Sequence, residues 1–321
     1  IVGDQWLLTP KQLYAEAVWE KCDWLLYGGA AGGAKDLALS EEVPTPSGWN
    51  AVGDLAVGDL VLTERGEPCS VVQLHPIARR PVYRLTFDDG STVVAGTEHR
   101  WWTFTASELA QLTRLDPEWR ARRRSTRTPE THDAPWLVGK NTKPAPVGGI
   151  RTTGEIAATL RTARGRTNHA IPVCDAIDLP ERDLPIDPYV LGAWLGDGSS
   201  THATMAAHVD DQPHMRAQFE SAGFATTDRA TAHTFGVLGL STLLRRHGLL
   251  GNKHLPPEYL RASAKQRLAL LQGLMDADGT ANDSGSVSFT NTNRGLVEAV
   301  IEVACSLGHK VRMIEKRATL N

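Results

Sequence analysis

Two short segments in the C-terminal half of the sequence decide the fold. The first is Leu191-Gly192-Ala193-Trp194-Leu195-Gly196-Asp197-Gly198, and the second is Leu271-Gln272-Gly273-Leu274-Met275-Asp276-Ala277-Asp278-Gly279. Each reads as an apolar helix with small residues that ends in Asp-Gly. The two terminal aspartates, Asp197 and Asp278, lie 81 residues apart, which indicates an internal duplication of a unit of roughly 80 residues.

The small residues and the aspartates have a joint chemical meaning. Helices rich in glycine and alanine pack backbone against backbone, so a pseudo-twofold pair would bring Asp197 and Asp278 together. Two adjacent carboxylates repel each other unless a cation lies between them. Oxygen ligands favour Mg²⁺, which also binds phosphate and stabilises the oxygens of a phosphodiester during cleavage. We therefore expect Asp197 and Asp278 to bind Mg²⁺, although a single Asp-Gly after a helix is an ordinary turn.

These two elements resemble the paired motifs of the LAGLIDADG (dodecapeptide, DOD-type) homing endonucleases. The segment Asn252-Lys253-His254-Leu255-Pro256-Pro257 is similar to the lysine-containing block between the motifs. The resemblance covers residues 186–321. It implies a pseudo-twofold α+β domain with antiparallel sheets that bind double-stranded DNA at the host-gene insertion site. It also implies that Asp197, Asp278 and Lys253 are catalytic in phosphodiester hydrolysis, with Mg²⁺ as cofactor.

Hydrophobic periodicity gives the secondary structure of the remaining sequence. Apolar residues recur at helical spacing over 187–196, 212–222, 263–276 and 293–307. Residues 36–105 instead read as short strands with tight turns, over 60–63, 71–74, 82–87 and 92–95. Asp89-Gly90 predicts a hairpin between the last two strands. We expect an all-β module in this part of the chain.

The predicted β-module resembles the N-terminal part of a Hint-type intein splicing domain. The resemblance lies in Val43-Pro44-Thr45-Pro46-Ser47-Gly48-Trp49 and in the segment from Asp88 to Trp101. It implies that His99 activates and protonates the scissile peptide bond. Protein splicing is an acyl transfer that needs a nucleophile, an acid at the leaving nitrogen and an oxyanion site.

Three departures from the intein pattern affect the expected splicing chemistry. Asp36 stands where most inteins carry Cys or Ser, and Gly96 stands where threonine is usual. The C-terminal splicing blocks do not precede Asn321, so we expect no excision by the chain as printed. A minority class of inteins lacks the first nucleophile and carries tryptophan two residues after the histidine, as Trp101 does here. The alternatives are that Trp101 is a core residue and that Asp36 marks a degenerate element.

Residues 1–35 contain an incomplete phosphate-binding motif. A capping box at Thr9-Pro10-Lys11-Gln12 is followed by a strand candidate and a glycine-rich turn that ends at Lys35. This segment is similar to the start of a phage terminase large-subunit ATPase. The resemblance implies that the spliced host protein would bind ATP through Gln12, Gly29, Gly33 and Lys35. The alternative is a glycine-rich loop of an unrelated fold.

Composition limits the protein classes that remain. The chain has 321 residues, with 34 Lys+Arg against 37 Asp+Glu and a net charge of −3, so a uniformly basic nucleic-acid binder is excluded. Four dispersed cysteines without a CxxC pair argue against a disulfide framework and indicate a reducing cytosol. The terminase resemblance implies that this is the cytoplasm of a phage or bacterial host cell. No apolar run is long enough to cross a membrane. We expect a monomer without a membrane partner.

Together these features predict a multidomain chain: an all-β Hint-type module and a pseudo-twofold α+β LAGLIDADG domain, after a short α/β host fragment. The predicted boundaries are 1–35 for the host fragment, 36–105 for the splicing module, 106–185 for a linking and DNA-recognition region, and 186–321 for the nuclease. In the third region, arginines cluster at Arg120, Arg122, Arg123 and Arg124, which are either phosphate contacts or a solvated helix face. The alternative function is a degenerate splicing element whose nuclease is inactive.

Overall fold

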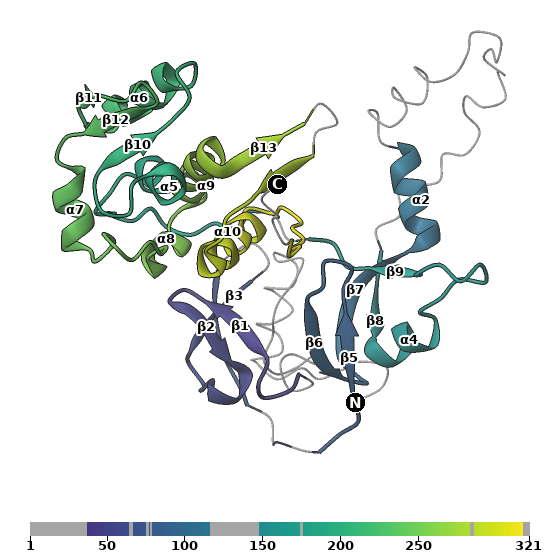
Figure 1. Cartoon of the computed structure of the whole chain (residues 1–321). Helices are drawn as coiled ribbons and strands as arrows, with labels where there is room; N and C mark the ends of the chain where they lie inside the picture. Colours follow the sequence, from purple (N-terminus) through teal and green to yellow (C-terminus); the bar gives the residue numbers. More distant parts are fainter. Residues whose placement is uncertain are drawn as a thin grey trace, which may run out of the picture.

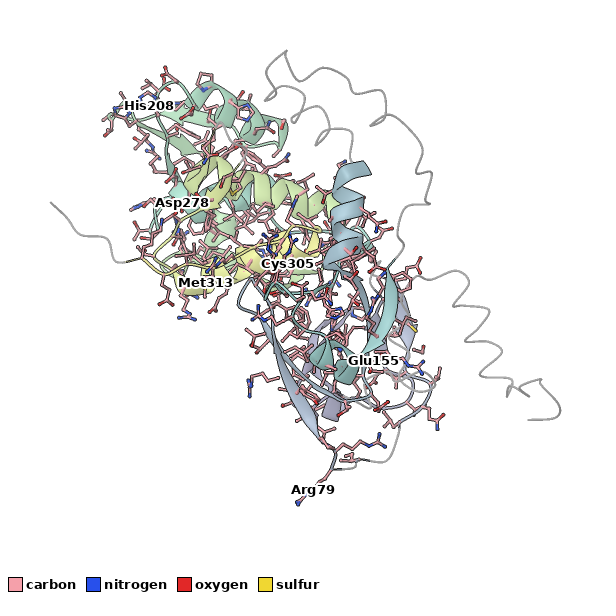
Figure 2. All side chains as sticks on the ribbon, turned by 90° about the vertical axis from the view of Figure 1, so that its right-hand side faces the viewer. Arg79, Glu155, His208, Asp278, Cys305 and Met313 are labelled. Carbon is pink, nitrogen blue, oxygen red and sulfur yellow. The ribbon has the colours of Figure 1, made fainter. Side chains whose placement is uncertain are left out.

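The computed structural model describes residues 37–63, 67–74, 77, 79–115, 148–173, 176–282 and 286–316. The predicted host fragment, with its capping box and glycine-rich turn, lies outside the described residues, as do Asp36 and the arginine cluster 120–124. Figure 2 shows Asp278 in the upper part of the molecule, with Glu155 and Arg79 below it.

The two small-residue helices lie side by side at the centre of the C-terminal domain (Figure 1). They are α5 (Pro188–Asp197) and α9 (Ala264–Asp278). Asp187 caps α5 by accepting hydrogen bonds from the backbone N–H groups of Tyr189 and Val190. Ser263 and Gln266 form a reciprocal capping box at the start of α9. Caps of this kind fix where each helix begins, and therefore where each terminal aspartate falls.

Further helices and two small sheets surround this pair. The helices are α6 (Gln212–Ser221), α7 (Leu240–Arg246), α8 (Pro257–Leu260) and α10 (Arg294–Ser306). One antiparallel sheet has the order β10 (Thr204–Ala206), β12 (Thr234–Val237), β11 (Thr226–Asp228), and the other pairs β13 (Gly279–Ala281) with β14 (Val287–Phe289). The four helices predicted from periodicity are confirmed, with ends that differ from the prediction by no more than two residues.

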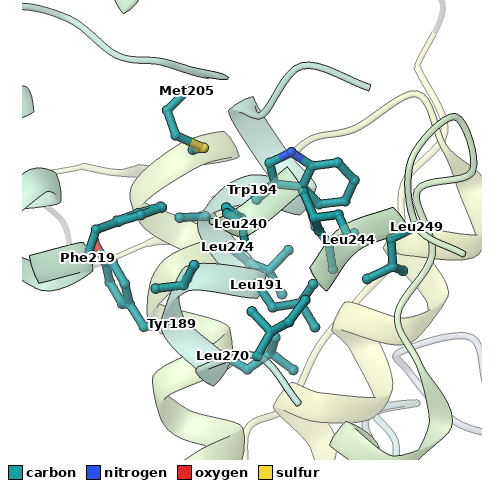
Figure 3. Close-up of a cluster of buried hydrophobic side chains, with 14 of the residues drawn as sticks. Tyr189, Leu191, Trp194, Met205, Phe219, Leu240, Leu244, Leu249, Leu270 and Leu274 are labelled. Carbon is teal, nitrogen blue, oxygen red and sulfur yellow. The ribbon is translucent and has the colours of Figure 1, made fainter. Parts of the chain in front are cut away.

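The core of this domain forms around the helix pair (Figure 3). Trp194, Leu191 and Leu270 are fully buried, and they pack with aromatic and aliphatic side chains from α6, α7 and β12. Because α5 is buried almost all round, its hydrophobicity shows no single apolar face. The central helices are therefore held in a fixed position by packing on every side.

The N-terminal module consists of antiparallel hairpins. They are β1 (Glu42–Thr45) with β2 (Gly48–Ala51), β3 (Leu60–Leu62) with β4 (Pro68–Ser70), and β5 (Val82–Thr86) with β6 (Thr92–Gly96). A 3₁₀ turn, η2 (Val52–Asp54), follows β2. The hairpin predicted at Asp89-Gly90 is confirmed. The strand predicted over 71–74 is wrong: β4 ends at Ser70, because the opposite chain turns at Gly58 just beyond Asp59, whose carbonyl accepts a bond from the Val71 N–H.

A three-stranded sheet continues beyond the boundary predicted after residue 105. Its central strand, β7 (Arg100–Thr105), pairs with β8 (Gly149–Thr152) on one part and β9 (His169–Ala170) on the other. Two helices accompany it, α2 (Ala106–Leu115) and α4 (Thr153–Ala158). The sheet thus takes strands from both sides of residue 105, and its surroundings are mixed α and β.

The tip of the first hairpin contacts the C-terminal domain. The indole N–H of Trp49 donates to Glu302 at 2.9 Å, and Glu302 also forms an ion pair with Arg261 at 2.7 Å. The Arg261 guanidinium lies 6.0 Å from the centre of the Trp49 ring. Figure 1 shows β1 and β2 below α8 and α10, where these contacts form. We refer to Trp49, Arg261 and Glu302 as the hairpin contact.

Candidate functional site

The candidate site is built on an unusually close helix pair. A Cβ added to Gly192 of α5 would lie 2.9 Å from the Leu274 nitrogen, and one added to Gly273 of α9 would lie 2.8 Å from the Ala193 nitrogen. Real Cβ atoms do not approach backbone this closely, so only glycine fits at either position. Residues 81 apart in the sequence therefore have equivalent contacts, which confirms the predicted duplication in three dimensions.

The same symmetry brings the ends of the two helices together. A Cβ at Gly196 would contact the Ala277 side chain and lie 3.5 Å from a carboxylate oxygen of Asp278. Asp197 is the last residue of α5 and Asp278 the last of α9. Both carboxylates therefore sit at helix C-termini, where the helix dipole is negative. This position disfavours negative charge, so a cation beside the two carboxylates would be stabilising.

Lys253, in the loop before α8, supplies one positive charge at this site. Its ammonium donates to the carbonyl oxygens of Leu195 at 3.1 Å and Gly196 at 2.9 Å, which are unsatisfied groups at the end of α5. The ammonium also lies 5.1 Å from the centre of the Trp194 ring. The lysine singled out from the sequence is thus brought to the same helix end as Asp197.

The charges at this site are partly removed from water. Burial, followed by the charge of Asp278, raises the pKa of Asp197 above its ordinary value, although Lys253 acts in the opposite direction. Burial lowers the pKa of Lys253 more than the two carboxylates raise it. For both groups desolvation outweighs charge pairing, so the three side chains do not neutralise one another fully.

The donor set suits a hard cation that keeps water ligands. The residues described by the structure contain no group of three or more His, Cys, Asp and Glu arranged to hold a metal. Two carboxylates fit Mg²⁺, because it is held in proteins by one or two carboxylates together with waters and substrate phosphate. They do not fit zinc, which needs three or four protein ligands.

Sequence reasoning missed two residues beside this site, Asn291 and Asn293. The Asn291 amide donates to Asp278 at 2.6 Å, and the Asn293 amide donates to the Lys253 carbonyl oxygen at 2.9 Å. Asn293 also caps α10. The signal in the sequence was the run Asn291-Thr292-Asn293 between a short strand and a helical pattern, which is typical of an N-cap.

The described residues of the predicted splicing site, His99 and Trp101, lie at the start of β7. His99 and Trp101 have ring centres 4.6 Å apart, and the Trp101 indole donates to the Thr153 hydroxyl at 2.9 Å. The Thr153 N–H donates to the His99 carbonyl oxygen at 2.8 Å. Thr153 was missed in the sequence because it lies 52 residues from Trp101 and follows a capping residue.

The described chain begins close to this cluster. Leu37 forms a bridge with Ala95 on β6, and the Ala38 N–H donates to the Val94 carbonyl at 3.0 Å. Strand β6 leads directly to His99. Asp36 itself, the ATP-site candidates Gln12, Gly29, Gly33 and Lys35, and the DNA-contact candidates Arg120, Arg122, Arg123 and Arg124 lie outside the described residues.

Comparison with known protein families identifies the C-terminal part of the chain. Residues 265–319 match the family model described as LAGLIDADG-like domain. This segment contains Asp278, Asn291 and Asn293, together with α9, β13, β14 and α10. Residues 265–319 are therefore LAGLIDADG-like, which supports the resemblance at the second duplicated element; the first element, at residues 191–198, lies outside the match.

Curated relatives and solved structures extend the comparison. The chain is 38% identical over 296 residues to the replicative DNA helicase DnaB of Mycobacterium intracellulare, covering 91% of this chain and 46% of that protein. It is 40% identical over 78 residues to DnaB of Mycobacterium leprae, covering 24% of this chain and 13% of that protein. The chain thus spans less than half the length of these relatives. They do not support the terminase host that we expected, because both are DnaB proteins.

Solved intein structures are also similar in part. One, the "Msm DnaB1 intein splicing domain bound with zinc", is 47% identical, with coverage of 21% of this chain and 54% of that chain and a TM-score of 0.20. The "MchDnaB-1 intein" is 29% identical, with coverage of 41% and 65% and a TM-score of 0.23. At these TM-scores the likeness does not extend to the arrangement of the whole chain. Among the described residues, no helix has both the length and the apolar character needed to cross a membrane.

Proposed function

We propose that this chain is an intein whose LAGLIDADG-like domain is a homing endonuclease that cleaves both strands of DNA in a Mg²⁺-dependent reaction. The observation that carries the proposal is the meeting of Asp197, Asp278 and Lys253 at the ends of two backbone-packed helices. Structural ion pairs neutralise their charges locally, whereas here two partly desolvated carboxylates share a site with negative helix ends. Such an arrangement favours binding of a cation and a phosphate.

Each residue has a role that follows from its position. Asp197 and Asp278 would hold Mg²⁺, which when bound stabilises charge on the attacking and leaving oxygens of the phosphodiester. Two of the three N–H groups of Lys253 are directed to the Leu195 and Gly196 carbonyls. The third N–H is left to donate to a phosphate oxygen of the substrate, which would stabilise the charge that develops in the transition state.

The host gene is part of the proposal. One replicative DNA helicase matches 91% of this chain and a second matches 24% of it. We therefore propose a DnaB-type helicase as the host and its uninterrupted gene as the DNA target. The β10–β12–β11 and β13–β14 sheets follow the two motif helices, as expected for paired DNA-binding sheets. We propose that each sheet contacts one half of the target site.

Splicing is the second proposed activity of a complete chain. The contacts of His99 with Trp101, and of both with Thr153, support a shared site where β7 begins. His99 would protonate the leaving nitrogen at the upstream junction. The competing reading, a degenerate element with an inactive nuclease, is disfavoured by the retained Asp197, Lys253 and Asp278.

DNA cleavage tests the nuclease proposal. The purified chain is incubated with Mg²⁺ and a duplex that joins the host coding sequences on either side of the insertion. The matched control is the same duplex interrupted by intein coding sequence. We expect cleavage of both strands of the uninterrupted duplex only, and none in EDTA. Absence of Mg²⁺-dependent cleavage at that junction would contradict the proposal.

A further inference from the structure

A chain of hydrogen bonds links the Asp278 carboxylate to the Lys253 loop. The Asn291 side-chain amide donates to Asp278 Oδ2 at 2.6 Å, and the Asn293 backbone N–H donates to Asn291 Oδ1 at 2.8 Å. The Asn293 side-chain amide then donates to the Lys253 carbonyl oxygen at 2.9 Å. We refer to Asn291 and Asn293 as the asparagine relay.

The direction of each amide in the relay is fixed by its other partner. A backbone N–H can only donate, so the Asn291 side chain must turn its oxygen to Asn293 and its NH₂ group to Asp278. In the same way, Asn293 Oδ1 accepts from the Leu296 N–H at the start of α10, which directs its NH₂ group to Lys253. Neither side chain can flip without losing a hydrogen bond, so both are rigid donors.

Strand register explains how Asn291 reaches the site. Gly279 lies opposite Phe289 in the β13–β14 hairpin, and the Thr290 N–H adds a bond to the Asp278 carbonyl at 3.2 Å. The next residue, Asn291, therefore lies beside the last residue of α9. The hairpin brings the chain back to the carboxylate from which it started.

The relay makes the two halves of the site unequal. Within the described part of the chain, no side chain hydrogen bonds the Asp197 carboxylate, whereas one oxygen of Asp278 is occupied by Asn291. Lys253, in turn, binds carbonyls of α5 alone. Thus the relay connects α9 and α10 to the loop whose lysine contacts the opposite helix.

We propose that Asn291 and Asn293 are positioning residues that hold the Asp278 carboxylate and Lys253 in a fixed relation during DNA cleavage. This inference rests on the proposed function. Asn291 occupies Oδ2 and leaves Oδ1 of Asp278 for the cation, while Asn293 fixes the backbone from which the Lys253 side chain extends. Loss of either amide would let one catalytic group move relative to the other.

Three variants separate positioning from folding. Asn291→Ala removes the donor to Asp278. Asn293→Asp keeps an oxygen that caps α10 but cannot donate to the Lys253 carbonyl. Thr292→Ala is the matched control, because this exposed side chain lies between the two asparagines. We expect single-turnover cleavage at saturating DNA to fall roughly 10- to 100-fold in the first two variants, as misplacement by about 1 Å does. The DNA dissociation constant and the thermal unfolding midpoint should stay near wild type.

A second measurement does not depend on nuclease activity. In metal-free protein, the side-chain NH₂ signals of Asn291 in ¹⁵N–¹H spectra should shift in Asp278→Asn, because its acceptor changes. The shift should be much smaller in Asp197→Asn. A wild-type chain that does not cleave DNA would overturn the proposed function, and these signals would then decide whether the relay exists. Unchanged Asn291 signals in Asp278→Asn, or wild-type cleavage by Asn291→Ala and Asn293→Asp, would overturn the relay.

Discussion

Gly273 of α9 packs so closely against Ala193 of α5 that a Cβ at residue 273 would lie 2.8 Å from the Ala193 nitrogen. This contact sets how far apart the ends of the two helices are. The Asp197 carboxylate is raised in pKa partly by Asp278, so the two charges interact across that gap. Helix packing in the core therefore also sets how strongly the two carboxylates interact at the site.

Substitution of the central glycines should destabilise the domain. Gly273→Ala forces a methyl group against the backbone of α5, which we expect to cost about 1–3 kcal/mol or more of unfolding free energy. Gly295→Ala is the control, because residue 295 is an exposed position in α10 where alanine favours the helix by up to about 1 kcal/mol. Chemical denaturation measures both. Equal stability of the two variants would refute the close packing.

Asp197→Asn should stabilise the metal-free protein at neutral pH. The folded-state pKa of Asp197 is raised above its ordinary value of 3.8, so the folded chain holds this proton more tightly than the unfolded chain. Its contribution to stability therefore declines as pH rises above 3.8 through the folded value. The asparagine variant should unfold at a higher temperature at pH 7 in EDTA, and the difference should vanish at low pH.

The exposed carboxylate Asp183 provides the comparison for that experiment. Asp183→Asn removes one negative charge from the surface without relieving a desolvated group. Its unfolding midpoint should follow that of the wild type at both pH values. A midpoint for Asp197→Asn below that of the wild type at pH 7 would mean that the Asp197 charge is stabilised in the folded chain.

The hairpin contact should stabilise the junction between the two parts of the chain. Glu302→Gln removes the anionic partner of Arg261, whose side chain is only 10% exposed. Leaving such a group unpaired costs about 1–3 kcal/mol. Trp49→Phe keeps the ring and loses only the N–H donor to Glu302, so it should cost about 1 kcal/mol or less. Denaturant unfolding measures the loss, and an unchanged free energy of unfolding in Glu302→Gln would contradict the contact.

The duplicated helices could be predicted from the sequence because their signal is local. Small residues at helical spacing, repeated 81 residues later with the same Asp-Gly end, allow few other structures. Asp197, Asp278 and Lys253 were found for the same reason, and the structure brings them together. Three short segments of the sequence therefore predicted the central residues of the site.

The supporting residues could not be predicted, because their roles depend on strand register and on distant partners. Asn291 reaches Asp278 only because β13 and β14 pair with Gly279 opposite Phe289. Thr153 meets Trp101 only because β8 pairs with β7. The strand expected over 71–74 failed for a related reason, since the chain opposite it leaves the ladder in a turn at Gly58, one residue beyond the partner of Val71.

Thr153 should matter for splicing of a complete chain. It accepts the Trp101 indole N–H and donates its backbone N–H to the His99 carbonyl. His99→Ala should reduce cleavage at the upstream junction by roughly 100-fold or more, as loss of a general acid does. Thr153→Val removes only the hydroxyl and should have a smaller effect, about tenfold. Gel analysis of precursor and products measures both, and normal splicing of His99→Ala would exclude its assigned role.

The proposed nuclease depends on Asp197 and Asp278 together, and a cleavage assay of their variants tests this. Asp197→Asn and Asp278→Asn are each assayed for single-turnover cleavage of the uninterrupted target duplex at saturating Mg²⁺. We predict that the cleavage rate falls by about 1,000-fold or more in each variant, because a bound metal ion stabilises the transition state by several kcal/mol. DNA binding and secondary structure should be retained. Cleavage at the wild-type rate by either variant would contradict the assignment of that carboxylate to the metal site.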